Sequence, residues 1–123
     1  MRFLCIICAE KMMEDMSAHD AAEHYAEYSR FTSDLRQNGQ LVDCNRLLPT
    51  DTAVTVRVRD GNVTTTDGPF AETKEHFGGY YLIDAPSMEA AIRIAARIPG
   101  ASMGCVEVRP IADDPQTKLA LSS

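Results

Sequence analysis

The sequence predicts an α+β domain in which two helices cover one face of an antiparallel sheet. Segments with the apolar period of a strand alternate with two segments that have the period of a helix, in the order β, α, β, β-hairpin, β, α, β. A chain of 123 residues suits one domain with a buried core. We expect this domain at residues 1–111 and a polar tail at residues 112–123.

The chain opens with an apolar strand and a long amphipathic helix. The first strand is expected at residues 2–8, and residues 10–16 are typical of a loop. Ser17 is suited to cap a helix that Gly39 ends, so we expect a helix at residues 18–38. Its apolar face is expected to follow spacings of three and four through Ala21, Tyr25, Tyr28, Phe31, Thr32 and Leu35.

Two histidines lie on this helix, and we expect both to be solvated. His19 and His24 are five positions apart, which turns them about 140° from each other around the helix axis. They therefore lack the i, i+4 spacing of a helical metal site. A tyrosine that keeps its phenol in a cleft is suited to hold a small molecule, which makes Tyr25 a candidate ligand-binding residue.

A β-hairpin is the clearest local signal in the middle of the chain. Valines at residues 54–59 alternate with threonine or arginine, so one face is apolar and the other carries Arg57 and Arg59. Asp60-Gly61 is a favoured two-residue turn. We expect the β-branched return strand at residues 63–66.

Three further strands and one helix complete the domain. Strands are expected at residues 40–48, 79–84 and 105–109. Between the last two, Ser87 is suited to cap an apolar helix that Pro99-Gly100 ends.

Two of the strands are more apolar than one covered face requires. Residues 3–8 and 80–83 are apolar at consecutive positions, which indicates burial on both faces. Because two helices cover only one face, we expect a second copy to cover the other, making the protein a homodimer.

Composition and charge exclude some partners. A net charge of -6 argues against nucleic acid and against an anionic membrane surface. The apolar run at the start of the chain is too short for a signal peptide or a membrane span, so we expect a cytoplasmic protein.

Four cysteines are expected to be free thiols in that compartment. Cys5 and Cys8 form a C-x-x-C pair, but residues three apart in a strand point to opposite faces. We therefore expect buried structural thiols and predict no metal, no cofactor and no disulfide.

Residues 66–79 form the candidate site, because five ionisable side chains gather there beside a Gly-Pro corner. Asp67 is the candidate acid–base residue and His76 its candidate assistant. The alternative for Asp67 is a turn residue that bonds to backbone N–H groups, and the register of the hairpin decides between the two. Candidates to orient an anionic or carbonyl-containing ligand are Arg57, Arg59, Arg109 and Lys74.

The same stretch carries a family resemblance. Its matching residues are Asp67-Gly68-Pro69-Phe70, Ala71 to Glu75 and Gly78-Gly79, with further matches at residues 55–57 and 104–110. The chain resembles the DGPF-domain branch of the YCII-related family. The resemblance implies a ferredoxin-like fold that pairs as a dimeric α/β barrel, and a carboxylate-based site in a cleft of that barrel. It also implies a family whose members mostly have no known activity and are often encoded beside extracytoplasmic-function sigma factors.

Three functional hypotheses follow. The first is a small-molecule enzyme that uses acid–base chemistry at Asp67. The second is a protein that binds a small ligand without catalysis, with a regulatory role linked to sigma-factor signalling. The third is a purely structural dimer in which Glu72, Lys74 and Glu75 form a solvated ion-pair turn.

Overall fold

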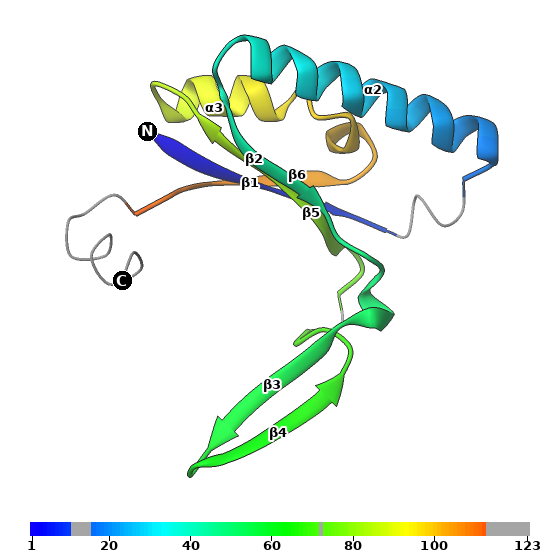
Figure 1. The fold of residues 1–123 in the computed structure, drawn as a ribbon, viewed down its shortest axis with the longest axis vertical. Coiled ribbons are helices and arrows are strands. Elements are labelled where there is room, and N and C mark those ends of the chain that lie inside the picture. The colour runs from blue at the N-terminus through cyan, green and yellow to red at the C-terminus, as the bar shows by residue number, and fades with distance from the viewer. Residues whose placement is uncertain (11–15, 72, 113–123) are drawn as a thin grey trace.

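The computed structural model describes residues 1–10, 16–71 and 73–112, and it confirms the α+β class (Figure 1). Most of the expected loop at residues 10–16 and of the expected tail at residues 112–123 lies outside the described residues. The elements in chain order are β1 (Arg2–Ala9), α2 (Ala18–Gln37), β2 (Leu41–Arg46), β3 (Val54–Arg59), β4 (Asn62–Asp67), β5 (His76–Asp84), α3 (Met88–Ala95) and β6 (Cys105–Pro110), with 3₁₀ turns at Thr50–Thr52 and Pro99–Ser102.

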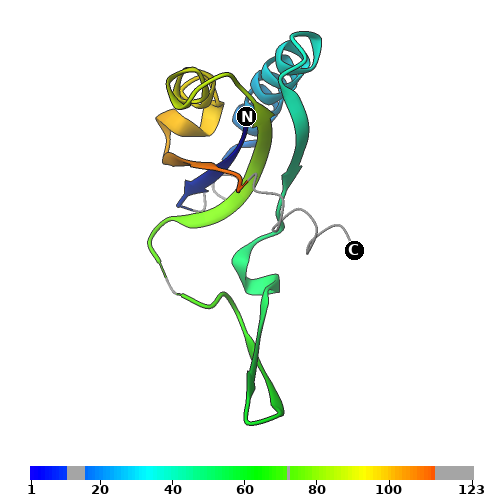
Figure 2. The ribbon, with the colours of Figure 1, turned by 90° about the vertical axis from the view of Figure 1, so that its left-hand side faces the viewer.

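Four strands form one antiparallel sheet in the order β2-β5-β1-β6. Helices α2 and α3 lie side by side on one face of this sheet (Figures 1 and 2). This strand order, with one helix after β1 and another after β5, is consistent with the ferredoxin-like fold. Strands β3 and β4 form a separate hairpin that projects away from the sheet (Figures 1 and 2).

Both helices begin at the predicted caps. The Ser17 hydroxyl accepts a hydrogen bond from the backbone N–H of Asp20 at 3.1 Å, and the Ser87 hydroxyl accepts one from Ala90 at 3.2 Å. The hairpin turn is also confirmed, since Asp60 and Gly61 both have positive φ angles of 52° and 76°. Local capping and turn chemistry therefore set these three boundaries.

The core lies between the sheet and the two helices. Its buried members come from the central strands β1 and β5, from the inner faces of both helices, and from the connections that follow β5 and α3. They are Phe3, Cys5, Phe31, Leu35, Tyr81, Ile83, Ala85, Ala91, Ile94, Ala95 and Ile98. Among the described residues, neither helix is long and apolar enough to cross a membrane.

The buried face of α2 differs from the expected one. His24 is only 9% exposed, whereas Tyr25 is 46% exposed. The prediction that His24 is solvated is therefore wrong. The buried stripe runs through His24, Phe31 and Leu35, at separations of seven and four that return to one side of a helix.

The first two cysteines lie on opposite faces of β1, as predicted. Cys5 is fully buried in the core beside Tyr81 and Val108, and burial raises the pKa of its thiol to about 11. Cys8 pairs across the ladder with Cys105 on the other face. The strand geometry therefore keeps the two thiols of the C-x-x-C pair from sharing one metal ion.

Candidate functional site

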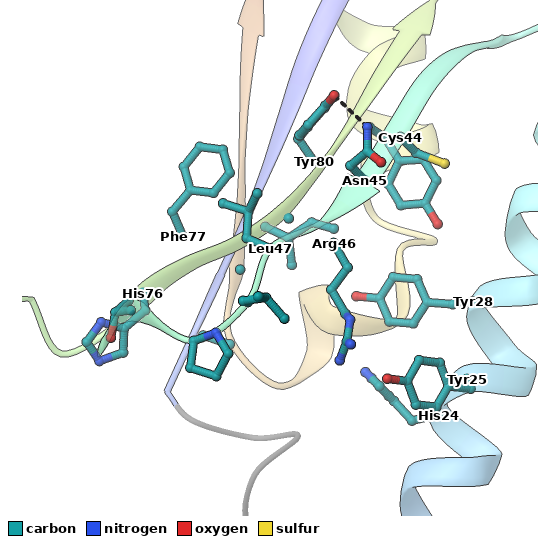
Figure 3. Close-up of a pocket in the computed structure, with 18 of the residues that line it drawn as sticks. His24, Tyr25, Tyr28, Cys44, Asn45, Arg46, Leu47, His76, Phe77 and Tyr80 are labelled. Carbon is teal, nitrogen blue, oxygen red and sulfur yellow. Dashed lines mark hydrogen bonds between the residues drawn. The ribbon is translucent and has the colours of Figure 1, made fainter. Parts of the chain in front are cut away.

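A cavity of about 650 Å³ lies between α2 and the helix-covered face of the sheet (Figure 3). One wall is the first half of α2, and the floor is formed by the ends of β1, β2 and β5. The connection at residues 46–50 closes one side. Most of the lining is apolar, with a few polar side chains among aromatic rings.

Gly79 has no side chain, and this leaves space at the floor of the cavity. Gly79 is buried on the helix-covered face, where it pairs with Ile7 on one side and Arg46 on the other. A Cβ at this position would lie 2.9 Å from the carbonyl oxygen of Asn45. The backbone of β2 therefore lies close to Gly79, and the absent side chain leaves space beneath α2.

The inner wall is a set of packed aromatic rings. Tyr28 and Tyr81 are stacked with centroids 6.4 Å apart and planes 4° apart, and His24 packs edge-on to Tyr28 at 4.9 Å. The Tyr28 hydroxyl accepts a hydrogen bond from the Gly100 N–H at 3.0 Å, and the Tyr81 hydroxyl shares one with Thr32 at 2.7 Å. These bonds fix the rings as a rigid wall.

Both phenols of this wall are unsuited to act as bases. Burial is the main cause that raises the pKa of Tyr28 and of Tyr81 above the ordinary value. A raised phenol pKa keeps the hydroxyl protonated, and each hydroxyl already has a protein partner. Their contribution to a ligand is therefore an aromatic surface.

The polar side chains of the cavity come from several elements. Arg46 extends from the end of β2 toward Tyr25 and Tyr28, and His24 reaches the same space from α2 (Figure 3). The Arg46 guanidinium carbon lies 5.5 Å from the centre of the Tyr25 ring. Glu10 and His76 also line the cavity, from the end of β1 and the start of β5. The cavity thus combines a cation, two imidazoles and a carboxylate.

Only part of the predicted site lies at this cavity. Tyr25 and His76 line it. Lys74 is exposed and forms an ion pair with Glu10 at 3.4 Å, which places its ammonium group beside a lining residue. Arg109 is exposed on β6 and pairs with Glu107.

The hairpin register separates Asp67 from the arginines of β3. Asp67 pairs with Val54, and directly paired residues of antiparallel strands project to the same face. Arg57 and Arg59 occupy the alternate positions and project to the opposite face. Within one chain the hairpin therefore does not form the expected shared cleft, and Asp67 is an exposed residue at the base of the hairpin.

The motif around Asp67 has a clear role in joining the hairpin strands. The Gly68 N–H donates to the carbonyl oxygen of Ala53 at 2.7 Å, and the Thr55 hydroxyl donates to the carbonyl oxygen of Gly68 at 2.8 Å. Phe70 is 83% exposed. These contacts close the base of the hairpin and leave the motif at the surface.

His24 and Arg46 are functional candidates that sequence reasoning missed. The signal for His24 was its separation of seven from Phe31 and of eleven from Leu35. The signal for Arg46 was its separation of two from Cys44, which places both on one face of a strand. Neither signal identifies a cavity, because the cavity depends on how α2 packs on the sheet.

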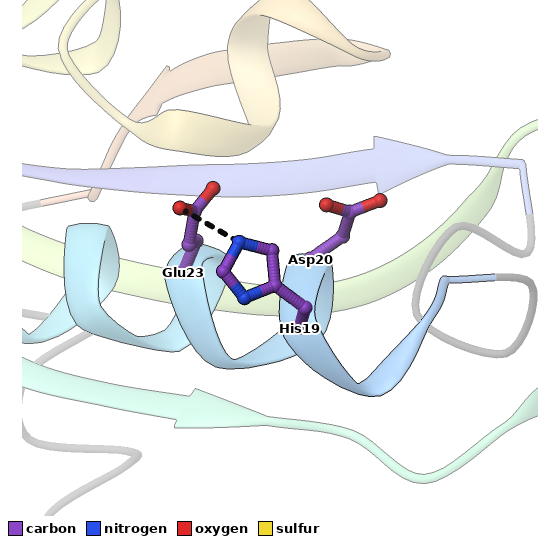
Figure 4. Close-up of side chains that lie close together, drawn as sticks. All are labelled: His19, Asp20 and Glu23. Carbon is purple, nitrogen blue, oxygen red and sulfur yellow. Dashed lines mark ion pairs between the residues drawn. The ribbon is translucent and has the colours of Figure 1, made fainter.

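A second group of ionisable side chains lies on the first turns of α2 (Figure 4). His19, Asp20 and Glu23 bring one ligand atom each to within 4.8 Å of one another, and His19 lies 3.3 Å from Glu23. All three side chains are exposed. Acidic residues near a helix N-terminus are stabilised there by the helix dipole, so this arrangement has a structural explanation.

Comparison with known proteins supports one family. The family model for the YCII-related domain matches residues 1–114. An uncharacterised protein from Rhizobium meliloti (strain 1021) is 40% identical over 105 residues, which cover 84% of this chain and 75% of that protein. The fold, the extent of this match and the similarity to that relative together establish that the chain belongs to the YCII-related family.

Proposed function

We propose that this protein binds a small organic molecule in the cavity between α2 and the sheet. The observation that carries this proposal is a cavity of about 650 Å³ with a rigid aromatic wall and a few convergent polar groups. Sites for small molecules have volumes of about 300–1,000 Å³ and the same mixture of apolar walls and a few placed polar groups. The size and the lining both fit this class.

An acid–base enzyme is the second candidate. His24, His76 and Glu10 line the same cavity, and imidazole and carboxylate groups are the usual proton donors and acceptors of enzymes. Asp67, the acid–base residue that the sequence predicts, does not line this cavity, so it could act only on a ligand bound elsewhere. Chemical turnover of a bound compound would support an acid–base enzyme. Binding without turnover would fit a regulatory protein of the DGPF branch.

A homodimer is part of the proposal, because the described residues of one chain leave two apolar surfaces without a cover. Leu4, Ile6 and Leu82 lie on the sheet face opposite the helices and are only half-buried. The hairpin adds exposed valines, with Val56 59% and Val63 68% exposed on its apolar face. Pairing of two open sheet faces, as in a dimeric α/β barrel, would bury apolar surface that water otherwise contacts.

Light scattering at micromolar concentration tests the dimer. We expect a mass twice that of the 13.5 kDa chain. Leu4→Asp places a charge on the open face and is expected to give a monomer, whereas Glu89→Asp on the exposed start of α3 leaves the dimer intact. A parent protein that stays monomeric contradicts the proposal.

A thermal-shift screen of small organic molecules tests binding in the cavity. A compound present at a free concentration of one hundred times its Kd is expected to stabilise the parent protein by about 2.7 kcal/mol. Ala21→Phe fills the cavity from α2 and should abolish the shift. Ala22→Phe is the matched control, because Ala22 is exposed on the next position of the same helix. Equal shifts in both variants would place the binding site elsewhere.

A further inference from the structure

We infer that the cavity takes an organic anion, with a planar apolar body against the Tyr28 and Tyr81 wall and an acidic group between Arg46 and His24. This inference rests on the proposed binding function and adds the chemical class of the ligand. It depends on three features: a guanidinium group directed into the cavity, a buried imidazole that opens to it, and flat aromatic walls beside both.

Arg46 supplies the positive charge. It pairs with Gly79 in the ladder, so its side chain starts on the face that α2 covers. No carboxylate in the described part of the chain forms an ion pair with Arg46, which leaves its charge available to a ligand. Its planar donors match the geometry of a carboxylate or phosphate, and the ring of Tyr25 holds the group in position.

His24 supplies a second polar group from the opposite wall. Among the histidine, lysine, arginine, aspartate and glutamate side chains of the described residues it alone is buried, and none of these residues hydrogen bonds to its ring. Every fully enclosed side-chain nitrogen and oxygen in the described ranges has a partner. The imidazole nitrogens are therefore open to the cavity that His24 lines, where a ligand or water completes their hydrogen bonding.

The remaining lining favours a flat apolar body. Tyr28 and Tyr81 present parallel rings whose hydroxyls are already bonded, and Gly79 leaves flat backbone on the floor. Offset stacking on such rings is the preferred geometry for an aromatic group. A planar ring or conjugated system therefore fits this wall better than a sugar or a peptide.

The charged side chains near the cavity decide whether it attracts an anionic ligand. The chain has a net charge of -6, so attraction for an anion has to come from nearby groups. Among the described residues that line the cavity, Glu10 has the one carboxylate, and Lys74 pairs with it at 3.4 Å. This pairing offsets the repulsion that Glu10 exerts on an anion, and Arg46 then provides the attraction.

Isothermal titration with matched acids and amides tests the ligand class. The probes are benzoate, phenylacetate and cinnamate, each compared with its neutral primary amide of nearly the same shape. We expect the acids to bind at least tenfold more tightly than the amides. Arg46→Gln should reduce the affinity for the acids at least tenfold and leave that for the amides unchanged, and His24→Phe should weaken acid binding as well.

Arg93→Gln is the control, because Arg93 is exposed on α3 and does not line the cavity. Equal binding of acids and amides overturns the inference, and so does acid binding that Arg46→Gln leaves intact. Absence of binding by all six compounds at millimolar concentration also overturns it. The proposed function fails by a different result, namely when Ala21→Phe leaves the shifts of screened compounds unchanged.

Discussion

Replacing Phe3 with alanine is expected to lower the free energy of unfolding by about 3–5 kcal/mol. Phe3 is fully buried on the central strand β1, where it pairs with Ile83 of β5. The change removes an aromatic ring from the layer between sheet and helices and leaves a cavity that the fixed strands cannot close. Chemical denaturation of the purified variant measures the loss.

Phe70→Ala is the matched control for this substitution. It makes the same chemical change at a side chain that is 83% exposed, so the expected effect is within about 0.5 kcal/mol. Comparable losses at the two positions would show that Phe3 does not lie in the core.

Replacing Gly104 with alanine is expected to cost about 3 kcal/mol, by forcing atoms into backbone that cannot move aside. A Cβ at Gly104 would overlap the carbonyl oxygen of Cys8 and lie 2.9 Å from the Cα of Ala9. Both neighbours belong to β1, which is held by ladders to β5 and β6. Accommodating the methyl group therefore requires the start of β6 to shift away from β1.

Gly78→Ala is the comparison for Gly104→Ala. The nearest atoms to a Cβ at Gly78 are carbonyl oxygens 4.0 Å away, so the same substitution has room. We expect its free energy of unfolding to match that of the parent within about 0.5 kcal/mol. If Gly104→Ala is equally well tolerated, Gly104 does not pack closely against the backbone of β1.

The elements of the fold could be predicted because each has a local physical cause. Ser17 and Ser87 cap the two helices through hydrogen bonds to residues three positions later. Asp60-Gly61 adopts the positive φ angles that a two-residue hairpin turn needs. These causes act over a few residues, so they can be read from the chain.

The candidate site was less predictable, because its geometry depends on packing between distant elements. His24 lies on α2, Arg46 on β2 and Gly79 on β5, and only the packing of the helix on the sheet brings them to one cavity. The burial of His24 follows from the same packing. A polar residue in the stripe looks like a break in the apolar pattern until the cavity beside it is known.

The placement of Asp67 shows a second limit. A shift of one residue in the hairpin register would move it to the face of Arg57 and Arg59. The two-residue turn fixes the observed register, in which Arg59 pairs with Asn62 and Val54 with Asp67. Asp67 is near Arg57 and Arg59 in the sequence, but the alternation of side chains along the strands places it on the opposite face of the hairpin.

A crystal structure with the most strongly stabilising compound of the thermal-shift screen tests whether the cavity beneath α2 is the binding site. We expect ligand density between α2 and the sheet, in contact with Tyr28 and with its acidic group at Arg46 and His24. Density at the hairpin base beside Asp67, with the cavity beneath α2 filled only by water, would contradict it.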